Sequence, residues 1–284
     1  MTKRKKPPHS THVLAQWADA YARERGLGRK RVRNWISYMV LGGQLERASI
    51  SVEGLRFTIK GAVALEMRLP YRARATKDID LIVSGVEDPD LAAVLRDAVE
   101  GTFQDFTFRV KGVPHLMPND AVRLQVAIEY RGRSWSTLQV DLSREEGGAT
   151  EVELVEALEL EPFGFSTPSA LPCLSLRYHI AQKIHGMTQP SNQKDGANER
   201  FRDLADVLLL RELVEDLAAV RAACVEVFAL RGTHAWPPVL DPPAFWEELY
   251  GKLAEGLALS EKRLEEAVPE AQAFIQAIDA AATR

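Results

Sequence analysis

The feature that most constrains this chain is a short segment, Asp78-Ile79-Asp80-Leu81-Ile82-Val83, in which acidic and apolar residues alternate as in a strand. Successive side chains of a strand point to opposite faces, so Asp78 and Asp80 are expected on one face and the apolar residues on the other. Two carboxylates this close repel each other unless a cation lies between them. Mg²⁺ is the usual cation, because it prefers oxygen ligands and often binds substrate phosphates as well. We therefore predict a metal site with Asp78 and Asp80 as ligands.

A turn of small residues precedes this strand. Gly61 and Ala62 join an expected strand, residues 57–60, to an expected helix, residues 62–69. Backbone N–H groups at the start of a helix bind phosphate, and small residues let the phosphate approach. Most turns of this kind serve packing only, so the turn alone is a weak signal. Its position before an Asp-x-Asp strand, however, is typical of a nucleotidyltransferase core that presents a triphosphate to a metal ion.

A third acidic residue, Asp141, lies in an expected strand, where it shares a face with Gln139 while Leu138, Val140 and Leu142 take the core face. Beside a metal pair, such a carboxylate can complete the metal shell or accept the proton of an attacking hydroxyl. An exposed strand residue with no catalytic role is an equally good interpretation of the spacing alone.

Lys183 stands among apolar neighbours on an expected helix, residues 174–187. A cation in such surroundings needs an anion, which is either a triphosphate or a carboxylate. Asp203 and Asp206 are three residues apart on the next helix and share one of its faces. Either carboxylate can pair with Lys183 or Arg202, and this structural role is at least as good an interpretation as a catalytic one.

Composition sets broad limits on the class of protein. The chain has 284 residues, a net charge of −4 and ordinary apolar content. No apolar run is long enough for a transmembrane helix, and the basic N-terminus has no apolar segment behind it, so neither a membrane protein nor a secretory signal is expected. Cys173 and Cys224 are far apart, which fits reduced thiols in a cytoplasmic protein. The acidic net charge argues against general nucleic-acid coating but not against a local basic groove.

The pattern along the chain predicts an α+β protein with a mixed sheet, followed by an all-helical C-terminal lobe. We expect a disordered basic arm over residues 1–10, a first lobe over residues 11–167 and a helical lobe over residues 168–284, with the active site in the cleft between the lobes. No strand signal is found after about Pro168. Residues 189–198 form a polar insertion between two helices of the second lobe.

Five short motifs occur in the order found in one family. They are Lys60-Gly61-Ala62; Arg74-Ala75-Thr76-Lys77-Asp78-Ile79-Asp80-Leu81; Leu138-Gln139-Val140-Asp141; Ile180-Ala181-Gln182-Lys183; and Asn198-Glu199-Arg200-Phe201-Arg202-Asp203-Leu204-Ala205-Asp206. With them, residues 30–280 resemble the AbiEii/MenT nucleotidyltransferase toxin family, which has a polymerase-β-like core.

The resemblance implies a toxin of a toxin–antitoxin or phage-defence system that binds nucleoside triphosphate and Mg²⁺ (or Mn²⁺) and adds nucleotides to the 3′ end of RNA, with tRNA as the expected acceptor. It also implies a cognate antitoxin as a partner. By motif match, the catalytic candidates are Asp78, Asp80, Asp141, Lys183 and Asp203. The candidates for nucleotide binding are Gly61, Ala62, Lys77, Lys183 and Asp206. Which of Asp141, Asp203 and Asp206 is the third acid stays open.

Two other functions stay open as well. One is nucleotidyl transfer to a protein or a small molecule, and the other is a core that binds nucleotide and regulates a partner without transfer. If RNA is the acceptor, it must pass the metal strand, and Arg72 and Arg74 lie just before that strand. We therefore predict that both arginines contact RNA phosphates, a type of contact that depends on salt more than on sequence.

Overall fold

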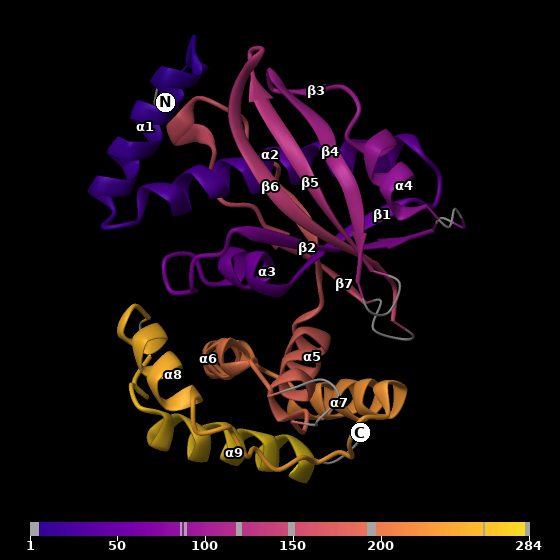
Figure 1. Cartoon of the computed structure of the whole chain (residues 1–284), viewed down its shortest axis with the longest axis vertical. Coiled ribbons are helices and arrows are strands. Elements are labelled where there is room, and N and C mark those ends of the chain that lie inside the picture. The colour runs from indigo at the N-terminus through magenta and orange to yellow at the C-terminus, as the bar shows by residue number, and fades with distance from the viewer. Residues whose placement is uncertain are drawn as a thin grey trace. The chain divides into compact units, whose positions relative to one another are not determined.

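A mixed sheet lies at the centre of the first of two compact units of the chain (Figure 1). The computed structural model describes residues 6–85, 87, 90–117, 121–146, 151–191, 197–257 and 259–281. We call Met1–Tyr71, Ala75–Glu145 and Leu154–Cys173 the sheet unit, and Arg72–Arg74, Glu146–Glu153 and Leu174–Arg284 the helical unit. The predicted α+β class with a mixed sheet is confirmed.

The described residues form eight strands in the order β3-β4-β5-β6-β2-β1-β8-β7. Strand β2 pairs with β1 in antiparallel and with β6 in parallel orientation, which makes the sheet mixed. The bounds of the strands are β1 Arg56–Lys60, β2 Asp78–Ser84, β3 Thr102–Phe103, β4 Phe106–Leu116, β5 Val122–Tyr130, β6 Arg133–Arg144, β7 Val152–Glu156 and β8 Ala170–Leu174.

Helices cover the apolar face of this sheet. Helices α1 (Thr11–Glu24) and α2 (Arg29–Ser51) contact β6, and α4 (Leu91–Ala98) contacts β4 and β5. The Ser10 side chain caps α1 by accepting a hydrogen bond from the Val13 N–H at 3.3 Å. Alternation in the central strands directs one row of side chains into this core; the row includes Ile79, Leu81, Val83, Val140 and Leu142, all at 1% exposure or less.

The segment Arg131-Gly132-Arg133, between two alternating runs, predicts a β-hairpin, and the structure confirms it. Arg131 and Gly132 both have positive φ, at 50° and 69°, as a two-residue turn of type I′ requires. Between Ile128 and Glu129 the register of β5 against β6 shifts by one residue, as at a β-bulge. With this shift Arg123 lies directly opposite Asp141, so the turn and the shift together decide which polar side chains meet on the open face of the sheet.

The sequence interpretation was wrong about the start of the second lobe. Residues 170–174, expected in a helical segment without strands, form β8, which pairs with β1 in parallel orientation. The sequence did not predict this strand because it contains Pro172, and proline is disfavoured in strand interiors. Burial compensates, since Leu171 and Cys173 are fully inaccessible to solvent. Residues 1–5 of the expected N-terminal arm and residues 192–196 of the polar insertion lie outside the described residues.

The helical unit is built from α5 and the helices that follow it. The bounds of its helices are α5 Leu176–Thr188, α6 Phe201–Leu210, α7 Leu217–Arg231, α8 Trp246–Glu255 and α9 Leu264–Ala280, with a short 3₁₀ turn η3 Arg211–Leu213. The sheet unit also contains α3 Gly61–Arg68 and a 3₁₀ turn η2 Glu161–Phe163. Helix α5 packs on α6 and α7. None of the helices in the described part of the chain is both long and apolar enough to cross a membrane.

A chain of hydrogen bonds joins α5 to the segment that follows α7. The direction of donation is fixed at both ends of this chain of hydrogen bonds. Arg231 can only donate, so at 3.4 Å the Nδ1 atom of His185 is an acceptor. At the other end, Thr188 donates to the Ile184 carbonyl at 2.7 Å, so its oxygen accepts from elsewhere.

These ends set the tautomers in between. His185 donates from Nε2 to the Thr233 hydroxyl at 2.9 Å, and that hydroxyl donates to Nδ1 of His234 at 2.9 Å. The Nε2–H of His234 then donates to Thr188 at 2.8 Å. Both imidazoles are neutral in this arrangement. Burial, followed by the charge of Arg231, lowers the pKa of His185 to about 3.

The helical unit should therefore lose stability in mild acid. An unfolded histidine binds a proton near pH 6.5, whereas His185 in the folded chain resists protonation down to about pH 3. Between these values the unfolded state binds more protons, so the free energy of unfolding falls as the pH falls. The expected loss from His185 is about 2 kcal/mol between pH 6.5 and pH 5.

Thermal midpoints measured from pH 7.5 to pH 5 test this expectation. His185→Gln should be less stable than the wild type at pH 7.5 but should show a shallower decline. His12→Gln is the matched control, because His12 is exposed on α1. A decline as steep in His185→Gln as in the wild type would contradict the assignment.

Candidate functional site

The predicted metal ligands lie on the open face of strand β2. Its burial alternates at the start, with Asp78 and Asp80 partly exposed and Ile79 and Leu81 fully buried. The two carboxylates therefore share a face, as the sequence indicated, while the apolar residues enter the core.

The register of the sheet places four charged residues in one row across the strands. Lys60 of β1 pairs with Asp80 of β2, Asp80 pairs with Asp141 of β6, and Asp141 pairs with Arg123 of β5. Directly paired residues project their side chains on the same face of a sheet. The two carboxylates are therefore neighbours in this row, and a cation lies at each end of the pair.

Arg123 and Asp141 form a bidentate ion pair. The Nε and Nη2 atoms of Arg123 donate to the two carboxylate oxygens at 2.8 and 2.7 Å. This hydrogen bonding to Asp141, opposed by partial burial, raises the pKa of Arg123, and the charges of Asp78 and Asp80 contribute in the same direction. Both oxygens of Asp141 are thus engaged by a guanidinium.

The turn predicted to bind phosphate lies directly against the metal candidates. Gly61 has a φ of +63°, and a Cβ atom at this position would come within 2.2 Å of Oδ2 of Asp80. Only glycine fits here, both for the backbone conformation and for the space. Gly61 is the first residue of α3, and Ala62 behind it is buried. The ammonium of Lys60 donates to the Ser143 hydroxyl at 2.7 Å.

The donor set on this face fits Mg²⁺ or Mn²⁺. Mg²⁺ in phosphate-handling sites is commonly held by one or two carboxylates, with water and substrate phosphates as the remaining ligands. Asp78 and Asp80 provide such a pair. In the residues that the structure describes, no group of three or more His, Cys, Asp or Glu side chains is arranged to hold a metal. A cation here would therefore depend on substrate oxygens as well.

Lys183 lies in the helical unit and is 5% exposed. Its ammonium donates to Oδ1 of Asp203 at 2.9 Å and to Oδ2 of Asp206 at 2.6 Å. The sequence left open whether either carboxylate pairs with Lys183, and both do. Arg202, the alternative partner in the sequence, instead stacks over Phe201.

Two arginines pair with these carboxylates from outside, Arg200 with an exposed side chain and Arg74 with a largely buried one. Arg200 donates to Asp203 at 2.6 Å, and Arg74 donates to both oxygens of Asp206 at 3.1 and 3.2 Å. Burial alone would raise the pKa of Asp203, but the charges of Lys183 and Arg200 outweigh it and lower that pKa to about 2. For Lys183, burial is likewise outweighed by the two carboxylates, which raise its pKa. Lys183 and Asp203 are therefore both charged at neutral pH.

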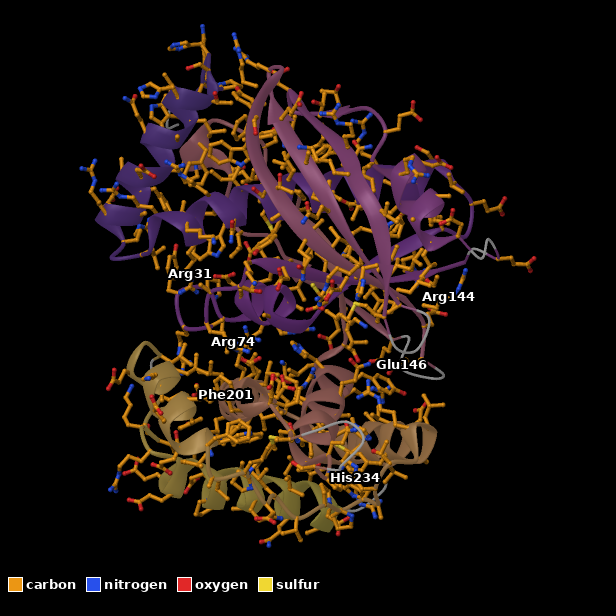
Figure 2. The ribbon with its side chains drawn as sticks, viewed as in Figure 1. Arg31, Arg74, Arg144, Glu146, Phe201 and His234 are labelled. Atoms are coloured by element: carbon orange, nitrogen blue, oxygen red, sulfur yellow. The ribbon has the colours of Figure 1, made fainter. Side chains whose placement is uncertain are left out.

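The two predicted RNA contacts belong to the same unit. Arg74 points at α6 (Figure 2), and Arg72 forms two hydrogen bonds of 2.8 Å with Glu212. Lys77, predicted to contact nucleotide, is exposed in the sheet unit. The structure thus groups Gly61, Ala62, Lys77, Asp78, Asp80 and Asp141 in the sheet unit, and Arg72, Arg74, Lys183, Asp203 and Asp206 in the helical unit.

Sequence reasoning missed Arg123, Lys60 and Arg200 as members of these clusters. Arg123 stands between apolar residues in Val122-Arg123-Leu124, a pattern that marks it as the polar face of a strand. The pattern does not say which carboxylate it meets, because that depends on the register between β5 and β6.

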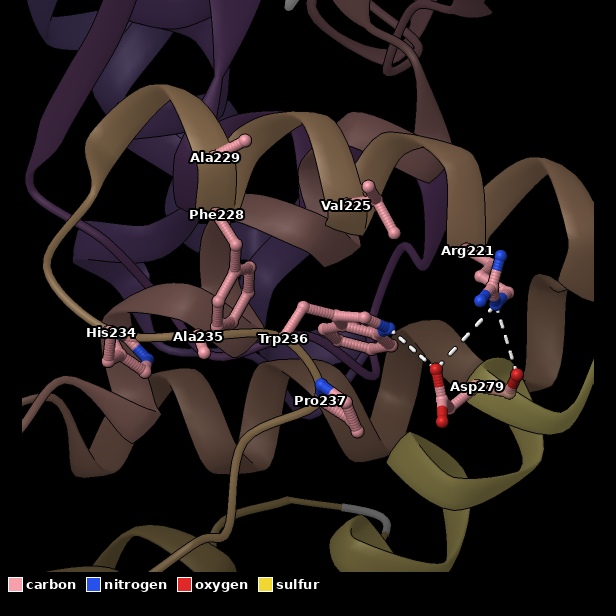
Figure 3. Close-up of a pocket in the computed structure, with 9 residues that line it drawn as sticks. All are labelled: Arg221, Val225, Phe228, Ala229, His234, Ala235, Trp236, Pro237 and Asp279. Carbon is pink, nitrogen blue, oxygen red and sulfur yellow. Dashed lines mark hydrogen bonds and ion pairs between the residues drawn. The ribbon is translucent and has the colours of Figure 1, made fainter.

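A cavity of about 430 Å³ opens in the helical unit, and none of the predicted site residues lines it. Phe228 and Trp236 form much of its wall, and the Trp236 indole N–H and the Arg221 guanidinium both point at Asp279 (Figure 3). Its charged groups are thus engaged with each other, and we assign no chemistry to this cavity.

Comparisons with known proteins agree with the geometry. MenT4, a nucleotidyltransferase toxin of Mycobacterium tuberculosis, has a similar structure, with a TM-score of 0.55 at 16% identity over 95% of this chain and 99% of that chain. This likeness shows the fold. An antigenic nucleotidyltransferase-like protein of Paracoccidioides brasiliensis matches with a TM-score of 0.42 at 12% identity, over 70% of this chain and 89% of that chain. The antibiotic-resistance factor ANT(2″)-Ia matches with a TM-score of 0.40 at 17% identity, over 69% of this chain and 94% of that chain. No curated protein matches the sequence.

The sequence itself matches a family over most of its length. Residues 44–283 match the nucleotidyl transferase AbiEii toxin of type IV toxin–antitoxin systems, and this range includes every candidate site residue. The resemblance inferred from the five motifs is thereby confirmed. The chain therefore belongs to the AbiEii nucleotidyltransferase toxin family of type IV toxin–antitoxin systems.

Proposed function

We propose that this protein transfers NMP from a nucleoside triphosphate to the 3′ end of RNA, with tRNA as the acceptor, and blocks translation in this way. The observation that carries the proposal is the pair Asp78 and Asp80 on the open face of β2, with the Gly61 turn packed against Asp80. Membership of the family supports the class of reaction. The proposal includes Mg²⁺ or Mn²⁺ as the cofactor, a cytoplasmic location and a cognate antitoxin as a partner.

The residues of the sheet unit divide the work in this proposal. Asp78 and Asp80 hold the cation, which neutralises charge on the triphosphate when it is bound. The N–H groups at the start of α3, at Gly61 and Ala62, bind phosphate oxygens, with Lys77 as a further contact. The 3′-hydroxyl oxygen of the acceptor attacks the α-phosphorus, the bond from that phosphorus to the bridging oxygen breaks, and pyrophosphate leaves. The hydroxyl proton passes to a carboxylate or to water.

Lys183 has two roles in the proposal. It neutralises Asp203 and Asp206, and these two bonds use two of the three N–H donors of its ammonium. The third donor is then the one offered to a phosphate oxygen of the nucleotide. Asp203 and Asp206 act in this proposal by holding Lys183 in place, because each already accepts a hydrogen bond from it.

The alternatives differ in the acceptor. Transfer to a protein or a small molecule would use the same metal pair. A protein that only regulates a partner would bind nucleotide without transferring it. Incubation with each labelled nucleoside triphosphate and total RNA distinguishes them. We expect label in tRNA, and we expect periodate oxidation of the RNA, which destroys the 3′ diol, to prevent it. Label in protein, or no label in any fraction, contradicts RNA as the acceptor.

The first prediction of this section concerns the metal pair. Asp78→Asn and Asp80→Asn should each reduce transfer by at least about 100-fold, since each removes a cation ligand worth several kcal/mol of charge stabilisation. Mn²⁺ binding followed by electron paramagnetic resonance should weaken in parallel. Asp105→Asn is the control, because Asp105 pairs with Arg131 elsewhere in the sheet unit. Wild-type turnover in either of the two β2 variants would refute the assignment.

The second prediction concerns the turn. Gly61→Ala should abolish transfer and weaken Mn²⁺ binding, because the added methyl would collide with the Asp80 carboxylate. Gly132→Ala is a matched control: its φ of +69° resembles that of Gly61, but no atom lies within 4 Å of the added carbon. Both variants bear a similar backbone cost of about 1–2 kcal/mol. Equal activity of the two variants would mean that the turn does not support Asp80.

The third prediction concerns Lys183. Lys183→Met leaves two buried carboxylates without their shared cation, so the free energy of unfolding should fall by about 3–5 kcal/mol. Lys252→Met, which removes an exposed pair with Glu248, should change the free energy of unfolding far less, because solvent screens that pair. Under conditions where Lys183→Met is folded, its affinity for nucleoside triphosphate should fall by at least about tenfold, as expected for a lost charge-assisted hydrogen bond. Unchanged affinity there would leave Lys183 a structural role only.

A further inference from the structure

The polar face that carries Asp78 and Asp80 continues across the sheet to its β4 side. Asp141 pairs with Arg123, and Arg123 pairs with His115 of β4. In the next row, Gln139 pairs with Gln125, and Gln125 pairs with Lys111 of β4. We propose that Lys111, His115, Gln125 and Arg123 form the surface that binds the single-stranded 3′ segment of the acceptor RNA through its phosphates. This inference rests on the proposed function and names the path of its acceptor.

Charge is the first argument for this occupant. Lys111, His115 and Gln125 are exposed, and Arg123 is 41% exposed. Lys111 and Arg123 are cations and Gln125 is an amide, although the chain has a net charge of −4. A local basic surface beside an acidic metal site is what a polyanion needs if its end is to reach that site.

Position is the second argument. In the sheet order β4-β5-β6-β2-β1, the Gly61 turn follows β1, and the basic surface lies on β5 and β4. Asp78 and Asp80 on β2 therefore have the proposed triphosphate turn on one side and the basic surface on the other. A transfer reaction needs this order, because nucleotide and acceptor must reach the metal from different directions.

Arg123 can contact a phosphate without leaving Asp141. Its Nε and Nη2 atoms are used by the carboxylate, and Nη1 is not among the atoms of that pair. Arg72, in contrast, uses both Nη atoms on Glu212, and Arg74 is 17% exposed. The guanidinium of Arg123 is thus held rigidly, with one edge on Asp141 and another edge available for an anion.

The experiment measures the affinity of the full-length protein for a labelled single-stranded RNA with a free 3′-hydroxyl, over a series of salt concentrations. Lys111→Gln and Arg123→Gln should each weaken binding, and each should reduce the slope of log affinity against log salt by about 0.7, the value for one lost contact to a single strand. Arg131→Gln is the matched control, because Arg131 is also 41% exposed and pairs with an aspartate, Asp105. The control should retain both affinity and slope.

The failure of this inference differs from the failure of the proposed function. If wild-type protein labels RNA while Lys111→Gln and Arg123→Gln keep wild-type RNA affinity and salt slope, the surface is not the RNA path, and the proposed function stands. If the variants lose affinity for a protein acceptor or an antitoxin but not for RNA, the surface binds protein, and the inference is overturned. If wild-type protein labels no RNA, the proposed function itself is refuted.

Discussion

The sheet unit is organised around the repulsion between Asp78 and Asp80, two carboxylates on one face of one strand. A cation can relieve that repulsion, and the register of the sheet supplies part of the relief in advance by placing Lys60 beside Asp80 and Arg123 beyond Asp141. The same constraint explains Gly61, since any side chain there would displace the carboxylate of Asp80. Each of these residues sits where the electrostatics of the aspartate pair requires a positive charge or open space.

The helical unit solves an opposite problem, the burial of a cation. An ammonium as deeply buried as that of Lys183 costs several kcal/mol of lost hydration, which only close anions can offset. Asp203 and Asp206 provide them at 2.9 and 2.6 Å. Arg200 also pairs with Asp203, and Arg74 also pairs with Asp206. Such a network favours one arrangement of α5 and α6, because removing Lys183 would leave two buried carboxylates without the cation they share. It keeps Lys183 in one rotamer and charged at neutral pH.

Sequence alone predicted what depends on local pattern. The alternation around Asp78 and Asp80 and the hairpin at Arg131-Gly132 are both local, and both are confirmed. What it missed depends on contacts between distant residues. Arg74 and Asp206 are 132 positions apart, and no spacing rule links them. Strand β8 was missed because Pro172 opposes strand formation locally, while burial against β1 decides the outcome. The partner of Arg123 depends on the register of β5 against β6, which shifts by one residue between Ile128 and Glu129.

The register also distinguishes three acidic residues that the sequence motifs treat alike. Asp141, Asp203 and Asp206 each matched a family motif, and the structure places them in two different settings. Asp141 shares the open face of the sheet with Asp78 and Asp80, lies in register with Asp80, and accepts two hydrogen bonds from Arg123. Asp203 and Asp206 lie on α6 and accept hydrogen bonds from the buried ammonium of Lys183. Strand register therefore separates a carboxylate beside the proposed metal pair from two carboxylates that hold a buried cation, a distinction that sequence motifs do not contain.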